Sequence, residues 1–259
     1  MERTVVQIIG LIPARMKASR FPGKPLFPIH GRPMVEHVWH RAKMFGGWDV
    51  LAMCTCDPEI EAFGKSKDFP VVMTSDRHVR ALDRVAEAAG KCGTPVGPND
   101  IVVCVQGDEP MMRPDMIDAV CKPFFDDASI QGTVLGMHIV EKDVFRHPDT
   151  VKIVHDIHGN VLYTSRSPIP YCKQFSPELG ARRIYGILAF RRHFLDLFTN
   201  LAPTPLELLE ACDSNRLCGS GLKQRVAFYP NVPSFSVDSP ADREKVEREI
   251  VHDPYWGKY

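Results

Sequence analysis

The sequence predicts an α/β fold with a central, mostly parallel but mixed sheet. In the first half, short β-branched apolar runs typical of strands buried on both faces alternate with segments of helical apolar spacing. In the second half, longer strand-like runs indicate that part of the sheet is antiparallel. The 259 residues are enough for one large α/β domain or for a domain with an added lobe.

Four predicted strands in the first half are each followed by a helix. The run VVQIIGLIP ends at Pro13, and the helical segment that begins at Arg32 ends at Gly46. Pro58 lies in the first turn of a helix started by Asp57. This alternation implies parallel strands with helices on both faces of the sheet. The predicted strands are 5–13, 49–56, 70–75 and 100–110, and the predicted helices are 32–46, 57–67, 81–93 and 113–125.

The second half combines longer strands with amphipathic helices. It contains no internal repeat and no low-complexity linker, so we predict one compact domain, 1–259, with an inserted β-rich lobe. The predicted strands are 132–140, 151–156, 161–171 and 225–230, and the predicted helices are 191–200, 204–217 and a last one that begins at Pro240.

The composition is that of an ordinary globular protein. Lys+Arg and Asp+Glu both number 32, so we expect neither nucleic acid nor a membrane as a partner. The apolar start is too short to span a bilayer and lacks signal-peptide features, so we expect a cytoplasmic protein. Its eight cysteines are expected to be reduced, and the Cys54/Cys56 pair has no second pair or nearby His at zinc-ligand spacing.

Charged clusters follow three predicted strands, the third a short one directly before Asp238, at the ends where ligands bind in open parallel sheets. Each cluster has a plain structural interpretation as well: a solvated basic loop, a turn, and a helix cap at Asp238. Together, basic side chains can neutralise a polyphosphate while two carboxylates hold Mg²⁺. Pro25 follows Gly23-Lys24, so the basic loop is not a P-loop. The clusters are Arg15, Lys17, Arg20 and Lys24; Gln106, Asp108 and Glu109; and Asp238.

These stretches also carry a resemblance to a known family. In order along the chain, IPARMKASRFPGKPL, GRPMVEHVWHRA, VQGDEPMM, VLYTSRSPIPY, IYGILAF, TPLELLE and VDSPADREKV resemble the 3-deoxy-manno-octulosonate (Kdo) cytidylyltransferases, or CMP-Kdo synthetases. The resemblance runs from Ile8 to Ile250. It implies a Rossmann-like nucleotidyltransferase fold, usually a homodimer, that transfers CMP from CTP to the anomeric hydroxyl of an acidic sugar and releases pyrophosphate.

The resemblance also implies roles for individual residues. Residues 1–130 would form mainly the CTP-binding half, and residues 131–259 the half for acceptor binding and dimerisation. The implied catalytic residues are Arg15, Lys24 and Asp108, and the implied ligands of a Mg²⁺ cofactor are Asp108 and Asp238. The implied nucleotide-binding set is Leu11, Pro13, Ala14, Arg15, Ser19, Arg20, Lys24, Thr74, Asp83, Arg84 and Gln106. The implied acceptor-binding set is Gln106, Arg166, Tyr185, Glu207 and Glu210.

The sequence departs from the family in three segments, all outside the basic loop and the two metal aspartates. VRALDR stands at 79–84 in place of the family's Ser-Gly-Thr-Asp-Arg, GARRIYG at 180–186 lacks the family's His, and DSNR at 213–216 replaces Glu-Gln-Leu-Arg. The changes add Arg80, Arg182 and Arg183, which we include as candidate acceptor-binding residues because guanidinium binds phosphate and carboxylate oxygens in pairs.

Several interpretations stay open at this point. The changed segments can be drift, or they can mark a different acceptor: another sugar acid, or a more anionic acid such as a phosphonate or a phosphorylated acid. A non-catalytic nucleotide-binding protein, or an enzyme that uses another nucleotide, is a further alternative. His37 and His40 lie three residues apart on a predicted helix without a third ligand nearby, which favours a packed or solvated pair over a metal site.

Overall fold

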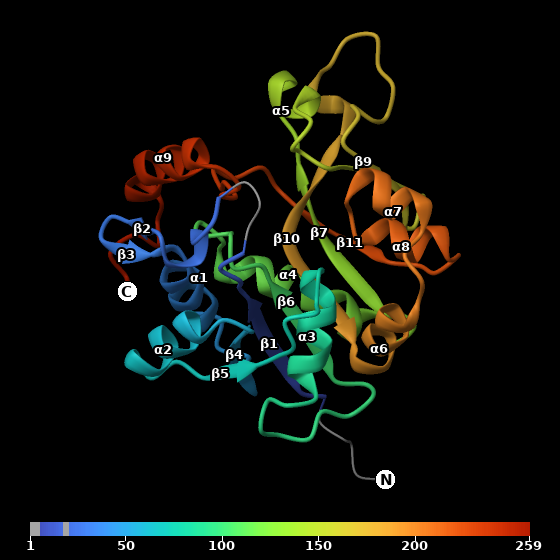
Figure 1. Ribbon diagram of the computed structural model, residues 1–259. Helices are drawn as coiled ribbons and strands as arrows, with labels where there is room; N and C mark the ends of the chain where they lie inside the picture. The colour runs from blue at the N-terminus through green and yellow to red at the C-terminus, as the bar shows by residue number, and fades with distance from the viewer. Residues whose placement is uncertain (1–5, 18–20) are drawn as a thin grey trace. The chain divides into compact units, whose positions relative to one another are not determined.

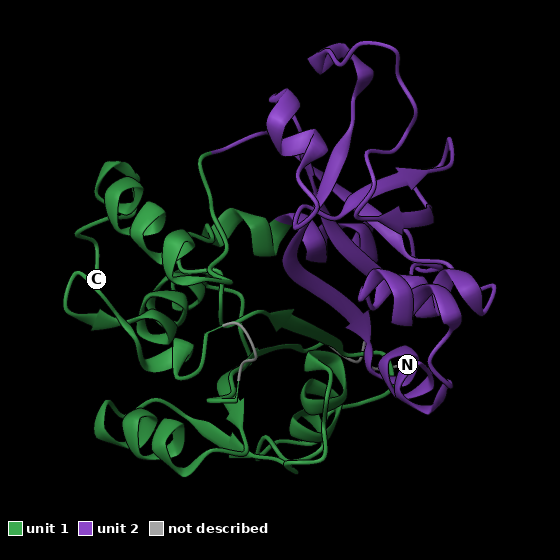
Figure 2. Ribbon diagram, turned by 45° about the horizontal axis from the view of Figure 1, so that its top comes forward, with its two compact units in different colours: residues 1–118, 233–259 green, residues 119–232 purple. Residues whose placement is uncertain are grey.

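The chain forms two compact units. Its structure, a computed structural model, describes residues 6–17 and 21–259. Unit 1 comprises residues 1–118 and 233–259, and unit 2 comprises residues 119–232 (Figure 2). The last segment, with Asp238, therefore belongs with the first part of the chain, whereas the sequence analysis assigned it to the second half.

Unit 1 is built on parallel strands in the order β6-β1-β4-β5, as the alternating pattern predicted. Their side chains are mainly apolar and buried; Leu11 and Ile12 of β1, for example, are fully buried. Helices α1 and α3 contact β1, and α2 contacts β4 and β5 (Figure 1). The strands are β1 (Ile8–Pro13), β4 (Val50–Thr55), β5 (Val71–Met73) and β6 (Ile101–Val105).

The helices of unit 1 fall where the sequence predicts them. They are α1 (Met34–Lys43), α2 (Pro58–Ser66), α3 (Ala81–Ala89) and α9 (Pro240–Glu249), while α4 (Pro114–Asp126) crosses the boundary between the units. Short elements that the sequence analysis did not predict are the 3₁₀ turns η1 (Lys24–Leu26) and η3 (Ile250–His252) and a hairpin of β2 (Pro28–Ile29) and β3 (Arg32–Pro33).

The start of α9 corrects one interpretation of Asp238. The helix is capped by Ser239, whose hydroxyl accepts a hydrogen bond from the Asp242 amide while the Asp242 carboxylate accepts one from the Ser239 amide at 2.9 Å. This reciprocal pair is a capping box. The interpretation of Asp238 as the helix cap is therefore wrong, and so is the expected short strand before it, because residues 230–237 form no strand.

Unit 2 has a mixed arrangement of strands, as its longer apolar runs predicted. β10 pairs antiparallel with β7 and β8, β9 pairs antiparallel with β8, and β11 pairs parallel with β7. The strands are β7 (Gly132–His138), β8 (Lys152–His155), β9 (Val161–Ser165), β10 (Arg182–Arg191) and β11 (Arg225–Tyr229). The other elements are α5 (Lys142–Arg146), η2 (Pro177–Leu179), α6 (Arg192–Asn200), α7 (Pro205–Glu210) and α8 (Ser214–Gly219).

The single helix predicted at 204–217 is two helices in the structure. Ala211 adopts a left-handed conformation with φ 50° and ends α7, and α8 begins at Ser214. Each piece has fewer residues than the apolar periodicity suggested. None of the helices in the described ranges is both long enough and apolar enough to cross a membrane.

Helix α1 is held by the C-terminal segment through buried polar groups. His37 is fully buried, with Nδ1 2.8 Å from the Tyr259 hydroxyl and Nε2 2.9 Å from the Ile29 carbonyl oxygen. The Arg41 guanidinium, also fully buried, donates to Asp253 at 2.8 Å. Burial disfavours the charged imidazole and lowers the pKa of His37 to about 4.

This shift predicts a pH-dependent loss of stability. Because His37 binds a proton with a pKa near 6.5 when unfolded and about 4 when folded, protonation favours the unfolded chain as the pH falls below 6.5. Urea unfolding should give a free energy of unfolding about 2 kcal/mol lower at pH 5 than at pH 7 from this group. His37→Gln should reduce that difference and the exposed control His252→Gln should keep it; an unchanged pH dependence in His37→Gln would contradict the assignment.

Candidate active site

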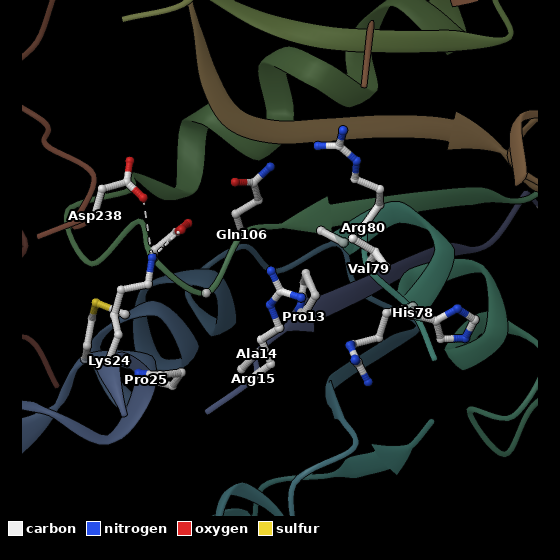
Figure 3. Close-up of a pocket in the computed structure, with 15 residues that line it drawn as sticks. Pro13, Ala14, Arg15, Lys24, Pro25, His78, Val79, Arg80, Gln106 and Asp238 are labelled. Carbon is white, nitrogen blue, oxygen red and sulfur yellow. Dashed lines mark hydrogen bonds and ion pairs between the residues drawn. The ribbon is translucent and has the colours of Figure 1, made fainter. Parts of the chain in front are cut away.

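A pocket of about 250 Å³ opens at the carboxyl ends of β1 and β6 in unit 1 (Figure 3). Because β1 and β6 are parallel neighbours, their carboxyl ends lie at the same edge of the sheet. Nine predicted site residues line it, namely Pro13, Ala14, Arg15, Lys24, Arg80, Arg84, Gln106, Asp108 and Asp238. The sequence analysis missed Pro25, Met34, His78, Val79, Ala81 and Gly107; of these only His78 is of a residue type that signals chemistry.

Lys24 joins distant parts of the chain at one end of this pocket. Its ammonium donates to Asp108 Oδ2 and to the Val237 carbonyl oxygen, each at 2.8 Å. It also lies 3.6 Å from Asp238 Oδ1 (Figure 3). The preceding Gly23 has φ 76°, a left-handed conformation that disfavours other residues and turns the chain into η1. The basic loop thus ends with its lysine between two carboxylates.

Two backbone contacts fix Asp108. The Val237 amide donates to the Asp108 carbonyl oxygen at 2.9 Å, which places Asp238 beside it. A Cβ atom at Gly107 would lie 2.7 Å from the Pro13 carbonyl oxygen, so only glycine lets the loop after β6 approach the end of β1 this closely. The side chains of Asp108 and Asp238 are 27% and 36% exposed, and both carboxylates can therefore reach a bound ion.

Arg15 and Gln106 supply polar groups that stay available in the pocket. Arg15 is exposed, and its guanidinium makes no hydrogen bond or ion pair with the described part of the chain. Asp57 holds the backbone of the same loop, since its carboxylate accepts a hydrogen bond from the Met16 amide at 2.7 Å. Ser19 and Arg20, two predicted nucleotide-binding residues, lie outside the described residues.

The side of the pocket formed by α3 carries a buried arginine. Arg84 is 3% exposed and donates to the Thr74 hydroxyl, to the Ser75 carbonyl oxygen at 3.3 Å and to Cys56 Sγ at 3.4 Å. Thr74, predicted to bind nucleotide, thus contacts Arg84 and in turn donates to Thr55 at 3.1 Å. These contacts fix a positive charge at the pocket wall.

The loop before α3 is fastened by Glu87. Its carboxylate accepts hydrogen bonds from Lys91, from the Ser75 amide and from His78, a pocket-lining residue. The hydrogen bond from Lys91 and these further contacts lower the pKa of Glu87 to about 2. Of the remaining predicted nucleotide-binding residues, Leu11 is buried in β1 and Asp83 is half-buried in α3.

The predicted acceptor-binding residues other than Gln106 and Arg80 lie in unit 2, and two of them contact each other. Glu210 Oε2 accepts a hydrogen bond from the Arg166 amide at 2.8 Å, and Oε1 accepts from Tyr163 and Ser165 at 2.8 and 2.6 Å. Arg166 Nε donates back to the Glu210 carbonyl oxygen at 3.0 Å. Burial raises the pKa of the Glu210 carboxyl, but these hydrogen bonds outweigh it and leave the pKa below its ordinary value.

The other predicted acceptor residues are occupied within unit 2. Glu207 is fully buried, and its two oxygens accept from Arg216 at 2.8 and 2.7 Å. Arg182 donates to the Gly136 and Tyr229 carbonyl oxygens and lies 4.4 Å over the Phe228 ring. Arg183 lies 5.5 Å over the ring of Tyr185, which is 1% exposed.

Comparison with known proteins places this site in a family. Residues 9–231 match the cytidylyltransferase family. The 3-deoxy-manno-octulosonate cytidylyltransferases of Geobacter metallireducens and Nitratidesulfovibrio vulgaris are 37% and 39% identical, covering 95% and 90% of this chain and 98% and 92% of their own. The chain belongs to the cytidylyltransferase family. The solved CMP:2-keto-3-deoxy-manno-octonic acid synthetase complexed with CTP superimposes with a TM-score of 0.84 at 32% identity, covering 95% of this chain and 99% of that one.

These similarities confirm the predicted family, the nucleotidyltransferase fold and the assignment of the chain as an enzyme. In this cytidylyltransferase, Arg15 and Lys24 of the basic loop line one pocket of unit 1 together with both aspartates. The sequence analysis missed Val237 and Asp57, which contact the pocket loops through backbone hydrogen bonds. The roles of individual residues stay predictions.

The buried pair in unit 2 predicts a role for Glu207 in stability. Glu207→Gln removes the carboxylate that accepts two hydrogen bonds from the buried Arg216 guanidinium, so it should lower the free energy of unfolding by about 3 kcal/mol. Urea unfolding measures this loss of stability. Glu141→Gln makes the same change at an exposed residue and is the matched control. Glu207→Leu combined with Arg216→Met should recover much of the loss because it removes both charges. Wild-type stability in Glu207→Gln would contradict the role.

Proposed function

We propose that this enzyme transfers CMP from CTP to the anomeric hydroxyl of Kdo or a closely related sugar acid and releases pyrophosphate. The observation that carries the proposal is the meeting of Lys24, Asp108 and Asp238 in one pocket with Arg15 and Arg84. The names of the relatives and of the CTP-bound structure support CTP as donor and Kdo as acceptor.

The two aspartates fit a magnesium ion. One carboxylate oxygen of each lies within 3.6 Å of the same Lys24 nitrogen, so both can be directed at one small cation. Mg²⁺ prefers oxygen ligands and is often held by one or two carboxylates together with substrate phosphates. Within residues 6–17 and 21–259, no cluster of three or more His, Cys, Asp or Glu side chains suited to a metal occurs. Mg²⁺ bound at Asp108 and Asp238 would neutralise developing charge and acidify the attacking hydroxyl.

The cationic side chains of the pocket bind and orient the triphosphate in this proposal. Lys24 is only 12% exposed, and two hydrogen bonds and an ion pair hold its positive charge inside the pocket. Arg15 is exposed and can follow the phosphates as they bind. Arg84 is immobilised by Thr74 and Cys56 and contributes a constant positive charge at the opposite wall.

Arg166 is the residue of unit 2 best suited to the carboxylate of a sugar acid. Its side chain is 34% exposed, and its Nε and Nη1 atoms donate to the Glu210 and Pro148 carbonyl oxygens. Nη2 has no protein partner within the described residues, so this nitrogen can donate a hydrogen bond to a substrate oxygen. A guanidinium fixed on one side in this way recognises an anion directionally.

One observation favours the alternative of a more anionic acceptor. Arg80, one of the arginines added in the changed segments, lines the nucleotide pocket. Arg182 and Arg183, in contrast, already contact carbonyl oxygens, sulfur or aromatic rings of unit 2. The case for extra negative charge on the acceptor therefore depends on Arg80 alone.

A substrate panel tests the proposed function directly. Pyrophosphate release should occur with CTP, Mg²⁺ and Kdo, cease on chelation and return when Mg²⁺ is restored. Parallel reactions contain other sugar acids, phosphonates or phosphorylated acids, and other nucleoside triphosphates. Turnover only with a phosphonate or phosphorylated acid would overturn Kdo as acceptor, and the absence of turnover with every acid would favour a nucleotide-binding protein without catalysis.

Substitutions in the pocket should abolish most of the activity. Lys24→Ala and Asp108→Asn each remove a fixed charge beside the transferring group, which should cost at least about 100-fold in kcat/KM. Steady-state kinetics with CTP and Kdo measure the loss. Lys65→Ala and Asp126→Asn remove the same charges from exposed surface sites and serve as controls. Activity within about twofold of wild type in either pocket variant would rule out the assigned role.

A further inference from the structure

Lys152, the first residue of β8, is a fully buried lysine that no step of the proposed function uses. Its ammonium donates to the His147 carbonyl oxygen at 3.0 Å, to the Thr150 carbonyl oxygen at 2.6 Å and to the Arg166 carbonyl oxygen. All three N–H groups of the ammonium are thereby used. Burial lowers the pKa of Lys152 to about 8.

Burying an ammonium group costs free energy, so the groups that compensate its charge indicate which segments it stabilises. Lysine is almost never fully buried unless its charge is compensated. Here the compensation comes from carbonyl dipoles of two separate segments, the turn 147–150 and the end of β9. The register of the sheet places the Lys152 ammonium near the Arg166 carbonyl group, because Lys152 lies directly opposite Ser165, the residue before Arg166.

The same turn also contacts the side chain of Arg166. Nη1 of Arg166 donates to the Pro148 carbonyl oxygen at 3.1 Å and lies 3.8 Å from Asp149 Oδ1. Lys152 therefore constrains Arg166 in two ways. It donates to the Arg166 carbonyl oxygen, and it fixes the turn that contacts the Arg166 guanidinium.

Glu210 holds Arg166 from the opposite side. Its carboxylate accepts the Arg166 amide hydrogen, and its carbonyl oxygen accepts from Arg166 Nε. The N–H and the C=O of a single residue are thus each bound by a charged side chain, one acidic and one basic. Such fixing of a binding residue through its backbone aligns its free donors before the substrate arrives.

We propose that Lys152 is a positioning residue for the acceptor: it ties the turn 147–150 to Arg166 and so holds the Arg166 guanidinium in the direction that binds an acidic substrate group. This inference rests on the proposed function, in which Arg166 binds the acceptor carboxylate. Lys152 itself need not touch the substrate.

A double-mutant cycle separates positioning from general stability. KM for Kdo and for CTP are measured in wild type, Lys152→Met, Arg166→Met and the double variant. Lys152→Met should raise KM for Kdo at least about 10-fold and leave KM for CTP unchanged. In the Arg166→Met background the same substitution should change KM for Kdo little, because the group that Lys152 positions is already gone.

A second measurement does not depend on turnover. Hydrogen–deuterium exchange of the 147–151 and 164–168 peptides should speed up in Lys152→Met, with exchange of the β1 and β6 peptides unchanged. If Lys152→Met does not fold, Lys152→Arg makes the same comparison, since a planar guanidinium cannot reproduce the three-way donation of an ammonium.

The outcomes distinguish the two proposals. An unchanged KM for Kdo in Arg166→Met, or no turnover of Kdo by the wild type, would overturn the proposed function at Arg166 and the inference with it. A raised KM in Arg166→Met together with an unchanged KM in Lys152→Met would overturn the inference alone. Lys152→Met could instead raise KM for Kdo by the same factor with and without Arg166, or raise KM for Kdo and for CTP equally. Either result would show general destabilisation and would also overturn the inference.

Discussion

The ammonium of Lys24 is the interaction on which the architecture of the active site depends. It contacts Asp108 after β6, and Val237 and Asp238 before α9, so three segments far apart in the sequence converge on one nitrogen. Without this positive charge the two carboxylates would repel each other in a partly buried pocket. The C-terminal segment therefore helps to form this pocket, although it follows the whole of unit 2 in the chain.

The two units use buried cations in different ways. Lys24 compensates carboxylates and stays partly exposed, which suits a group that binds phosphate. Lys152 is fully buried and donates to three carbonyl oxygens, which suits a group that fixes the backbone. Arg216 and Glu207 form a third arrangement, a buried bidentate pair that holds α7 and α8 together. Residue type alone does not distinguish these roles, because the surroundings decide them.

The three segments that depart from the family have different consequences in the structure. The segment at 79–84 contributes Arg80 to the pocket, where it can affect substrate choice. The segment at 180–186 places Arg182 against Phe228 and sheet carbonyls, an internal packing role. The segment at 213–216 supplies the partner of Glu207. Only the first of them therefore bears on the question of the acceptor through the pocket described here.

The sequence by itself determined the fold class, the parallel strands of unit 1 and the positions of Arg15 and Asp108 just after the ends of two strands. These features are readable because apolar periodicity and strand ends are local, and strand ends in a parallel sheet meet at one edge. The tertiary structure alone decided that Ser239 caps α9, that Glu207 is buried and that Lys152 supports Arg166. Those assignments depend on contacts between a side chain and a carbonyl group or charge from another part of the chain. A local sequence pattern does not show which residue provides that partner.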